Sequence, residues 1–524
     1  SYYRAMMEPA ADALAQRINW LRQMRRDTYA VAKEWVAAGC AAKQIDSNSA
    51  LASEEWLAGP MSVLRHLGLL QKTLEHLLKT DAPLLNDDEL EQRNGSWVAK
   101  VFPRGWLDPL LFSGYRAEIR FLKKESPSSI RANMARSYFE DNGEWAGRCV
   151  VLGAGNVSSI GLQDVLNKVF CENYKCVLKL NPVNDYLGEI YEQAFRVLIE
   201  ADVLEIVHGG AEVGARLVHD AETTAVHITG SSRVHNAIVH GDPALDKPIT
   251  SELGCVTPIM IVPGEWSQRQ LRDQAVNVAS MLVNNASFNC NAAKVLVTAK
   301  GWPQRKDFLD ALRYVLAKTE TRFAYYPGAE QRHADFCAAY PDAAVSSDSV
   351  SQGHLPWVLA SGLDANVVTQ MAFTDEAWCG VLAEVPLAVE TPADFLSSAT
   401  EFCNQHLFGN LSCGIIIDAA TQKSVGDAYE QAINELRYGA VAINVWPAVV
   451  YALGVTPWGA YPENSLESIS SGIGFVHNTR MFEGIEKCVL EAPFRPMIHP
   501  PWMVNNEHRL AVAKAFTWLE ARRY

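Results

Sequence analysis

The chain contains 524 residues, a length that predicts two or three domains at about 150 residues each. Its 48% hydrophobic and 20% charged residues are typical of a water-soluble globular protein. A net charge of −14 argues against a nucleic-acid partner, because such binding needs an excess of basic side chains to replace phosphate counterions.

Eleven cysteines are spread along the chain without a CxxC pair, which predicts a reducing compartment and no structural zinc site. No HExxH or GxSxG motif indicates metalloprotease or serine hydrolase chemistry. The N-terminal residues lack the apolar stretch of a signal peptide, and the longest uncharged run, residues 439–461, favours a buried strand and apolar loop over a membrane helix. We therefore expect a cytoplasmic protein with no metal and no membrane span.

The first ninety residues are predicted to be mostly helical. Apolar residues recur at helical spacing over residues 10–38 and again from Pro60 to Leu78. Asn94-Gly95 then predicts a turn into a strand over residues 97–102. Residues 123–145 are polar without a long apolar run, and we expect a surface arm or an interface element there.

From Arg148 onward the pattern alternates between strand and helix. Strands are predicted over residues 148–155, 175–180, 203–207 and 225–230, with helices over 161–172, 190–201 and 211–218. A second series of strand-like segments covers residues 294–298, 367–373, 380–387, 413–418 and 439–445. The predicted fold class is α/β, with two doubly wound parallel-sheet domains joined near residues 250–260 and a helical N-terminal part.

Two features of the first half suggest a dinucleotide. The turn GAGNVSS, residues 153–159, follows the first strand, where phosphates meet a helix N-terminus, although Ser158 replaces the third glycine of GxGxxG and a plain tight turn is the alternative. Lys179 ends the next strand and can bind ribose hydroxyls or a 2′-phosphate, or simply cover the sheet edge. Gly230 and Ser231 follow a later strand and can hold a pyrophosphate, unless Ser231 only caps the next helix.

Two further residues could carry covalent chemistry. Glu252 lies at the join of the two halves among apolar neighbours, so it is a candidate general base or, alternatively, a solvated charge. Cys290 ends the polar run that starts at Asn284. Its thiolate can attack a carbonyl carbon if Asn156 and backbone N–H groups form an oxyanion hole, whereas the alternative is a buried structural cysteine.

Taken in order, these segments resemble the aldehyde dehydrogenase superfamily over about residues 145–480. GAGNVSS resembles the segment with the oxyanion asparagine, KCVLKLNP the strand with the ribose-binding lysine, and HITGSS the phosphate-binding turn. SELG is similar to the general-base motif, FNC to the nucleophile motif and DEAWCG to the motif that contacts the nicotinamide ribose. The resemblance therefore implies catalytic roles for Cys290, Glu252 and Asn156 and cofactor-binding roles for Lys179, Gly230, Ser231, Glu376 and Trp378.

Several positions depart from the family pattern. Phe288 replaces a usual glutamine, Cys255 a glycine and Trp378 a phenylalanine. Pro182 stands near the place where NAD-preferring members often carry a ribose-binding glutamate, so the expected cofactor is NAD or NADP.

The resemblance also implies a division of the chain. Residues 1–122, 147–252 and 475–492 would form a dinucleotide-binding domain and residues 253–474 a catalytic domain. Residues 123–146 would form an arm and residues 493–524 a C-terminal extension, both of them candidates for oligomerisation in a homodimer or homotetramer. The C-terminal stretch does not resemble the family's usual short oligomerising strand.

The activity implied is oxidation of an aldehyde to a carboxylic acid, through a thiohemiacetal and a thioester on Cys290 that Glu252 helps to hydrolyse. The alternatives are a CoA-dependent acylating dehydrogenase or acyl-CoA reductase of the same superfamily, which commonly lacks this glutamate, and a catalytically silent binding or structural member. The aromatic stretch 446–461 lies near the substrate mouth by resemblance and suggests a hydrophobic aldehyde.

Overall fold

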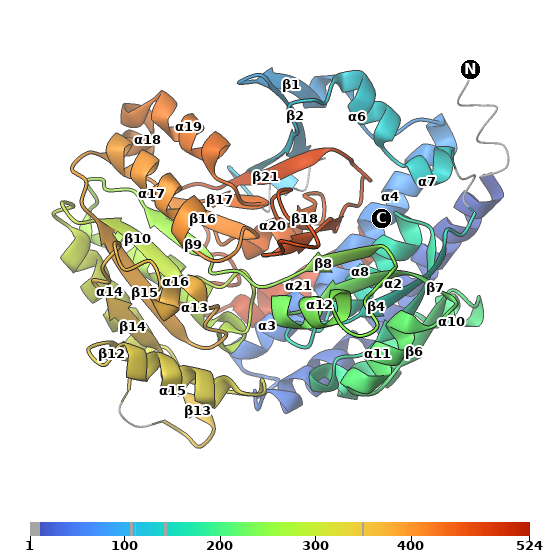
Figure 1. The fold of residues 1–524 in the computed structure, drawn as a ribbon, viewed down its shortest axis with the longest axis horizontal. Helices are drawn as coiled ribbons and strands as arrows, with labels where there is room; N and C mark the ends of the chain where they lie inside the picture. The colour runs from blue at the N-terminus through green and yellow to red at the C-terminus, as the bar shows by residue number, and fades with distance from the viewer. Residues whose placement is uncertain (1–10, 105–107, 110–111, 141–143, 348–349, 524) are drawn as a thin grey trace.

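The computed structural model describes residues 11–104, 108–109, 112–140, 144–347 and 350–523. Residues 1–10, which include the stretch inspected for a signal peptide and the first residue of the first predicted helix, lie outside this described part. Two sheets of unequal size, each covered by helices, make up most of the molecule (Figure 1).

The N-terminal part is helical, as predicted. Helices α2 (Ala11–Ala42) and α4 (Ser62–Thr80) pack against each other, and the apolar stripe of α2 is buried. Helix α3 (Ser53–Trp56) precedes a kinked segment, Leu57–Met61, in which Gly59 leaves the helical conformation before Pro60. Proline disfavours a helical conformation in the residue before it, so Pro60 lies within the kink instead of opening the helix.

The smaller sheet has the strand order β19-β8-β7-β4-β5-β6. Its strands are β4 (Gly147–Leu152), β5 (Tyr174–Lys179), β6 (Leu204–Val207), β7 (Thr223–Thr229), β8 (Ile249–Glu252) and the short antiparallel β19 (Gly472–Ile473). The connecting helices are α8 (Ile160–Phe170), α9 (Gly188–Ala194), α10 (Arg196–Glu200), α11 (Ala211–His219) and α12 (Ser232–Val239). The chain runs outward from β4 to β6 and then returns to pair β7 with the other side of β4. This reversal creates a topological switch point, the usual place of a ligand crevice in such sheets.

The larger sheet has the order β1-β2-β3-β21-β17-β16-β9-β10-β15-β14-β12. Seven neighbouring strands run parallel: β21 (Ile485–Glu491), β17 (Ala440–Ile443), β16 (Ser412–Ile416), β9 (Pro258–Ile261), β10 (Val295–Ala299), β15 (Val381–Leu387) and β14 (Val358–Ser361). Antiparallel strands extend both ends: β1 (Leu90–Arg93), β2 (Ser96–Phe102) and β3 (Arg116–Phe121) at one, β12 (Ala344–Val345) at the other.

The two faces of the larger sheet are covered by different helices. Helices α13 (Gln268–Val283) and α14 (Arg305–Lys318) follow β9 and β10, where the chain advances toward β14. Helices α17 (Pro392–His406), α18 (Ala419–Val425) and α19 (Asp427–Glu435) follow the return toward β17. Because parallel crossovers are right-handed, the reversal puts these two groups on opposite faces (Figure 1).

The predicted α/β fold class with two doubly wound sheets is confirmed, but one predicted strand is wrong. Residues 367–373 form a turn and the short helix α16 (Met371–Thr374), and the strand in this region is β14, earlier in the chain. The Asp364 carboxylate accepts the backbone N–H of Asn366 at 2.9 Å. This Asx turn ends the extended chain, and Val367 is left 50% exposed.

The sheet order also differs from the division expected from the sequence. Strands β1–β3 and β21, which were expected in the dinucleotide-binding domain, extend the larger sheet beside β17. In the expected arm, helices α6 (Pro127–Asn133) and α7 (Arg136–Phe139) bury Ile130 and Tyr138 in the chain's own core. A role of this segment in oligomerisation stays a prediction.

The C-terminal extension ends in helix α21 (Arg509–Arg522), which packs against α3, α4 and the kinked segment Leu57–Met61. In the part of the chain described, no helix combines the length and the apolar character needed to cross a bilayer. All eleven cysteines lie in this part, and each is a free thiol.

Candidate active site

The three predicted catalytic side chains meet in one cavity of about 150 Å³. Cys290 lies in the connection from α13 to β10, Glu252 ends β8, and Asn156 lies in the turn after β4. The Cys290 thiol donates a hydrogen bond to Glu252 Oε1 at 3.4 Å. The interval of 38 residues between them contains strand β9 and helix α13.

Glu252 is buried, with 3% of its surface exposed. Burial, and next the negative charge of Asp164, raise the pKa of this carboxyl to about 7. Its Oε2 atom has no hydrogen-bond partner among the described residues. A carboxyl group with a pKa near neutral and one free oxygen is suited to take a proton from water.

Asp164 was not identified from the sequence. It is fully buried on α8, where it accepts a hydrogen bond from Thr229 Oγ1 at 2.9 Å and lies 3.5 Å from His227 Nε2. No sequence motif marks Asp164 within α8, the helix that follows the glycine turn. Its influence on the pKa of Glu252 arises only when β7, β8 and α8 are packed together.

The thiol of Cys290 is held in its protonated form at rest. Burial, and next the charges of Glu252 and Glu376, raise the pKa of this thiol well above its usual value. A thiolate is the nucleophilic form of cysteine, so the adjacent Glu252 carboxylate is the group placed to receive the proton.

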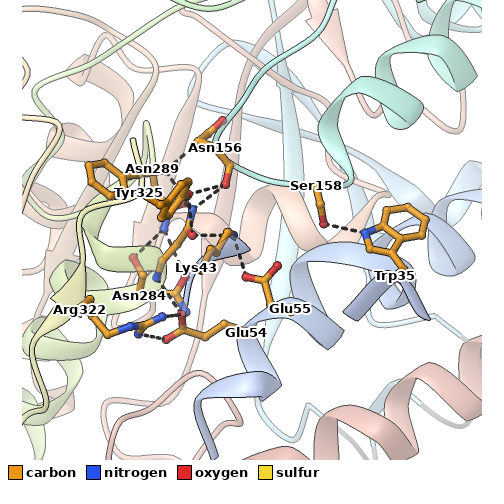
Figure 2. Close-up of polar contacts among 12 residues, drawn as sticks. Trp35, Lys43, Glu54, Glu55, Asn156, Ser158, Asn284, Asn289, Arg322 and Tyr325 are labelled. Carbon is orange, nitrogen blue, oxygen red and sulfur yellow. Dashed lines mark hydrogen bonds and ion pairs between the residues drawn. The ribbon is translucent and has the colours of Figure 1, made fainter. Parts of the chain in front are cut away.

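Asn156 is bonded to the Cys290 loop, which we define as residues 284–289. Its side-chain Nδ2 donates to the carbonyl of Phe288 at 2.9 Å, and its main-chain carbonyl accepts from Asn285 Nδ2 and from the Tyr325 hydroxyl, both at 2.9 Å (Figure 2). A primary amide carries two N–H donors, so one remains for a substrate oxygen.

The Cys290 loop is backbone-strained. Asn285, Ala286 and Ser287 have φ angles of 52°, 54° and 70°, in the left-handed region that disfavours residues with a Cβ. Each such residue costs about 1–2 kcal/mol, and strain of this kind persists only where surrounding contacts enforce it.

A buried ionic network supplies those contacts (Figure 2). Arg322 forms a bidentate ion pair with Glu54 at 2.8 and 3.0 Å, and Glu54 accepts the backbone N–H of Asn285 at 3.0 Å. Lys43 bonds both Glu55 Oε1 at 2.7 Å and Asn285 Oδ1 at 2.9 Å. The N-terminal part of the chain thus holds the loop that leads into Cys290, although no sequence motif linked the two regions.

Glu376, predicted to contact the nicotinamide ribose, lies next to the general-base motif. A Cβ at Gly254 would be 2.1 Å from Glu376 Oε2, so a side chain at position 254 would displace the Glu376 carboxylate. Burial raises the pKa of Glu376 to about 7, while the buried Lys294 opposes this shift. Glu376 Oε1 has no hydrogen-bond partner in the described part of the chain.

Two departures from the family pattern are packed together. Phe288 is 1% exposed and belongs to an aromatic cluster with Tyr325, Tyr326 and Trp378. The ring centres of Phe288 and Trp378 lie 6.4 Å apart, and those of Tyr326 and Trp378 5.5 Å apart. A glutamine at position 288 would place a polar amide among these rings. The two aromatic replacements, Phe288 and Trp378, therefore suit the same cluster.

None of the predicted cofactor residues lines the cavity, and Lys179, Gly230 and Ser231 lie at the carboxyl ends of strands of the smaller sheet. Ser231 caps α12 by accepting a hydrogen bond from the Val234 N–H at 3.3 Å. Helix capping was one of the two roles considered for this serine, the other being pyrophosphate binding. Lys179 is 7% exposed and makes no ion pair within the described residues, whereas its neighbour Asp185 pairs with His208 at 2.7 Å.

Comparison with known proteins reveals similarity to one family. The sequence model of the aldehyde dehydrogenase family matches residues 175–347, about a third of the chain. No curated protein sequence matches the chain.

Solved structures match almost the whole chain at low sequence identity. Lactaldehyde dehydrogenase from Escherichia coli is 15% identical with a TM-score of 0.61, over 92% of this chain and 87% of that one. A substrate-bound AldH from Staphylococcus aureus is 14% identical with a TM-score of 0.61, over 96% and 95%. An indole-3-acetaldehyde dehydrogenase in complex with NAD+ is 14% identical with a TM-score of 0.59, over 93% and 88%.

Proposed function

We propose that this chain, which has the aldehyde dehydrogenase fold and carries the family's sequence pattern over residues 175–347, oxidises an aldehyde to a carboxylic acid. The observation that supports this most strongly is the contact between Cys290 Sγ and Glu252 Oε1, at 3.4 Å within an apolar cavity. A nucleophile and a base of near-neutral pKa are the two groups that this reaction needs.

In the first step Glu252 takes the thiol proton, and Cys290 Sγ bonds to the carbonyl carbon while the carbonyl electron pair moves to oxygen. The free amide N–H of Asn156 and the Cys290 backbone N–H donate hydrogen bonds to this oxyanion. The product is a thiohemiacetal on Cys290. Burial of the site strengthens both hydrogen bonds, because no water competes for them.

The residues at the switch point fit an NAD or NADP cofactor. Glu376 Oε1, which has no hydrogen-bond partner within the described residues, can accept a ribose hydroxyl, and the Lys179 ammonium at the end of β5 can donate to another. Gly230 and the N-terminus of α12 at Ser231 suit a pyrophosphate, and Trp378 would border the nicotinamide ribose beside Glu376. When bound, the cofactor supplies the hydride acceptor that converts the thiohemiacetal to a thioester.

Glu252 acts again in the last step, after it has released the thiol proton to solvent. Its carboxylate takes a proton from a water molecule, whose oxygen attacks the thioester carbon; the carbon–sulfur bond then breaks, Cys290 leaves as a thiolate, and Glu252 returns the proton to its sulfur. Overall, one aldehyde, one water and one oxidised cofactor give one carboxylic acid, one reduced cofactor, which carries the hydride, and one released proton.

The Glu252→Gln variant tests this sequence of steps. We expect a burst of reduced cofactor of about one equivalent per site that is slower than in the wild type, because the amide cannot take the thiol proton, followed by turnover slowed at least 100-fold, because the amide cannot activate water. Stopped-flow absorbance with a panel of aliphatic and aromatic aldehydes measures both phases. Glu401→Gln, an exposed glutamate on α17, is the matched control and should behave as the wild type. A burst and a turnover at the wild-type rates would contradict both roles of Glu252.

The same assay separates the alternatives. Release of the acyl group to CoA would appear as turnover that requires added CoA, which the presence of Glu252 argues against. The Cys290→Ala variant should abolish turnover with every aldehyde. A silent family member would oxidise no aldehyde in the wild-type form. We further expect a cytoplasmic homodimer or homotetramer, to be checked by sedimentation velocity.

A further inference from the structure

We propose that the C-terminal helix α21, together with Pro501 and Trp502, forms a substrate-selecting wall that admits uncharged, apolar aldehydes of about six to eight carbons. This inference rests on the proposed function, because it concerns the same cavity. It assigns a role to the C-terminal extension, for which the sequence suggested only oligomerisation.

One face of α21 lines the cavity. Phe516, Leu519 and Glu520 are spaced three and four residues apart, so they share one side of the helix, and all three border the cavity. Trp518 lies on another side and is 47% exposed. The helix therefore presents Phe516 and Leu519, with Glu520 beside them, to the cavity that Cys290 also lines, and leaves Trp518 partly in solvent.

The facing walls are apolar as well. Helix α20 (Ala448–Leu453), the kinked segment Leu57–Met61, and the rings of Phe112 and Trp446 line the cavity opposite or beside α21. Phe112 and Phe516 lie 6.3 Å apart between ring centres. A substrate here would lose water contact on all these sides, which favours apolar chains and rings.

The charges of the lining disfavour an anionic substrate. Among the described lining residues Arg65 is the only cation, and its guanidinium is bound to Glu520 at 2.8 Å and to the Leu453 carbonyl at 2.7 Å. The side chains of Arg65 and Glu520 are 6% and 9% exposed. Glu54 adds a further acid, already paired with Arg322. Among the described lining residues, no cation is therefore left to bind a carboxylate carried by the aldehyde.

The wall is fixed to the rest of the molecule. Arg25 donates to the carbonyls of Glu520 and Ala521 at 3.3 and 3.1 Å, which ties the end of α21 to α2. The backbone N–H of Val504 donates to Ser280 Oγ on α13 at 3.0 Å. These contacts hold the wall in one place, so the cavity has a defined size.

That size sets the expected substrate length. A cavity of about 150 Å³ with apolar walls holds a ring of benzene size. Each methylene that is buried should raise kcat/KM about fourfold until the space is filled. We therefore expect kcat/KM to rise from propanal to hexanal and benzaldehyde, and to fall beyond about octanal.

The decisive variant is Leu519→Trp, which fills the cavity from the wall. We expect kcat/KM for hexanal and benzaldehyde to fall at least tenfold, while that for propanal stays within about twofold. Trp518→Ala, the exposed neighbour on the same helix, is the control and should leave the profile unchanged. Leu519→Ala is the second variant, and it should extend the profile toward decanal. If the dependence of kcat/KM on aldehyde length is unchanged in both Leu519 variants, the proposed substrate-selecting wall is wrong.

Binding without turnover separates this inference from the proposed function. Calorimetry with hexanamide, an uncharged probe of the same length, should detect binding to the wild type and at least tenfold weaker binding to Leu519→Trp. Hexanamide binding that distinguishes these two proteins, in a chain that oxidises no aldehyde, would support the wall and contradict only the proposed function. Equal hexanamide binding to the wild type and to Leu519→Trp would contradict the substrate-selecting wall, whether or not the chain oxidises aldehydes.

Discussion

At the residue scale, the chemistry depends on a buried carboxyl whose proton affinity is set by its neighbours. Glu252 is removed from water and lies near the negative charge of Asp164, and both effects favour its protonated form. Because the proposed hydrolysis needs the carboxylate, kcat should rise with pH through about 7.

Asp164→Asn tests the electrostatic part of this account. The amide keeps an oxygen that can accept the Thr229 hydroxyl but removes the negative charge, so the pKa of Glu252 should fall. The acidic limb of the kcat profile then moves to lower pH, and the ratio of the rate at pH 6 to that at pH 9 increases. A pH–rate profile of the steady-state reaction measures this ratio. Asp335→Asn, on the exposed side of α15 (Ala329–Ala339), should leave the limb in place, and an unmoved limb in Asp164→Asn would contradict the coupling.

The sequence carried enough information to predict Cys290 and Glu252 but not Asp164. The first two lie in short unusual segments, a polar run before a strand and an acid at a strand end, whose order along the chain is informative. Asp164 lies in α8, whose residues are all buried, and no motif marks it among them. Its importance comes from a distance to Glu252 that no local pattern records.

At the scale of elements, the Cys290 loop is held in a strained shape by helices that come more than 200 residues earlier in the chain. The Glu54–Arg322 pair is buried on both sides, with 8% and 6% of the two side chains exposed. The Arg322 guanidinium holds the pKa of Glu54 below its usual value.

Arg322→Met should therefore be strongly destabilising. It leaves the Glu54 carboxylate buried without its partner, which costs about 3–5 kcal/mol of the free energy of unfolding. We also expect kcat to fall more than KM rises, because the thiol is misplaced while the cavity walls remain. Urea denaturation and steady-state kinetics measure the two effects.

The control is Arg313→Met, which removes an exposed ion pair with Asp310 on α14. Exposed pairs of this kind contribute about 0.2–1 kcal/mol, so stability and kcat should change little. The double variant Arg322→Met with Glu54→Gln should recover part of the lost stability, since no charge is then left unpaired. Equal costs for the two arginines would refute the proposed role of the network.

Elements with a strong period were predicted well, and those governed by side-chain hydrogen bonds were not. Strands β4, β5, β6 and β7 of the smaller sheet follow the predicted segments closely, because buried β-branched runs between glycine turns have few alternatives. Residues 367–373 are apolar enough for a strand, yet the Asp364 turn excludes one. The αL run in the Cys290 loop was also not predictable, because it contains no glycine.

At the scale of the whole molecule, the site lies where two sheets meet. The predicted phosphate-binding residues belong to the smaller sheet, whereas Glu376 and Trp378 precede β15 of the larger one. A cofactor bound to both would link the two halves. The attachment of β1–β3 and β21 to the larger sheet could not be predicted, because it depends on which strand edges meet after folding.

Cofactor binding should therefore raise the melting temperature. At about 100 times Kd, NAD or NADP should add about 2.7 kcal/mol to the free energy of unfolding, and differential scanning fluorimetry measures the shift. Cys290→Ala should retain this shift, and Lys179→Met should reduce it, more for NADP than for NAD if the lysine meets the 2′-phosphate. A strong preference for NAD in the wild type, in both binding and KM, would defeat the expected tolerance of NADP.

The most direct test of the account is to identify the acylated residue. Glu252→Gln is mixed with hexanal and cofactor, quenched in acid within the burst and analysed by peptide mass spectrometry. We predict that the peptide containing Cys290 carries one hexanoyl group, and that no other of the eleven cysteines does. A burst of reduced cofactor with Cys290 unmodified, or an acyl group on another residue, would contradict the proposed mechanism.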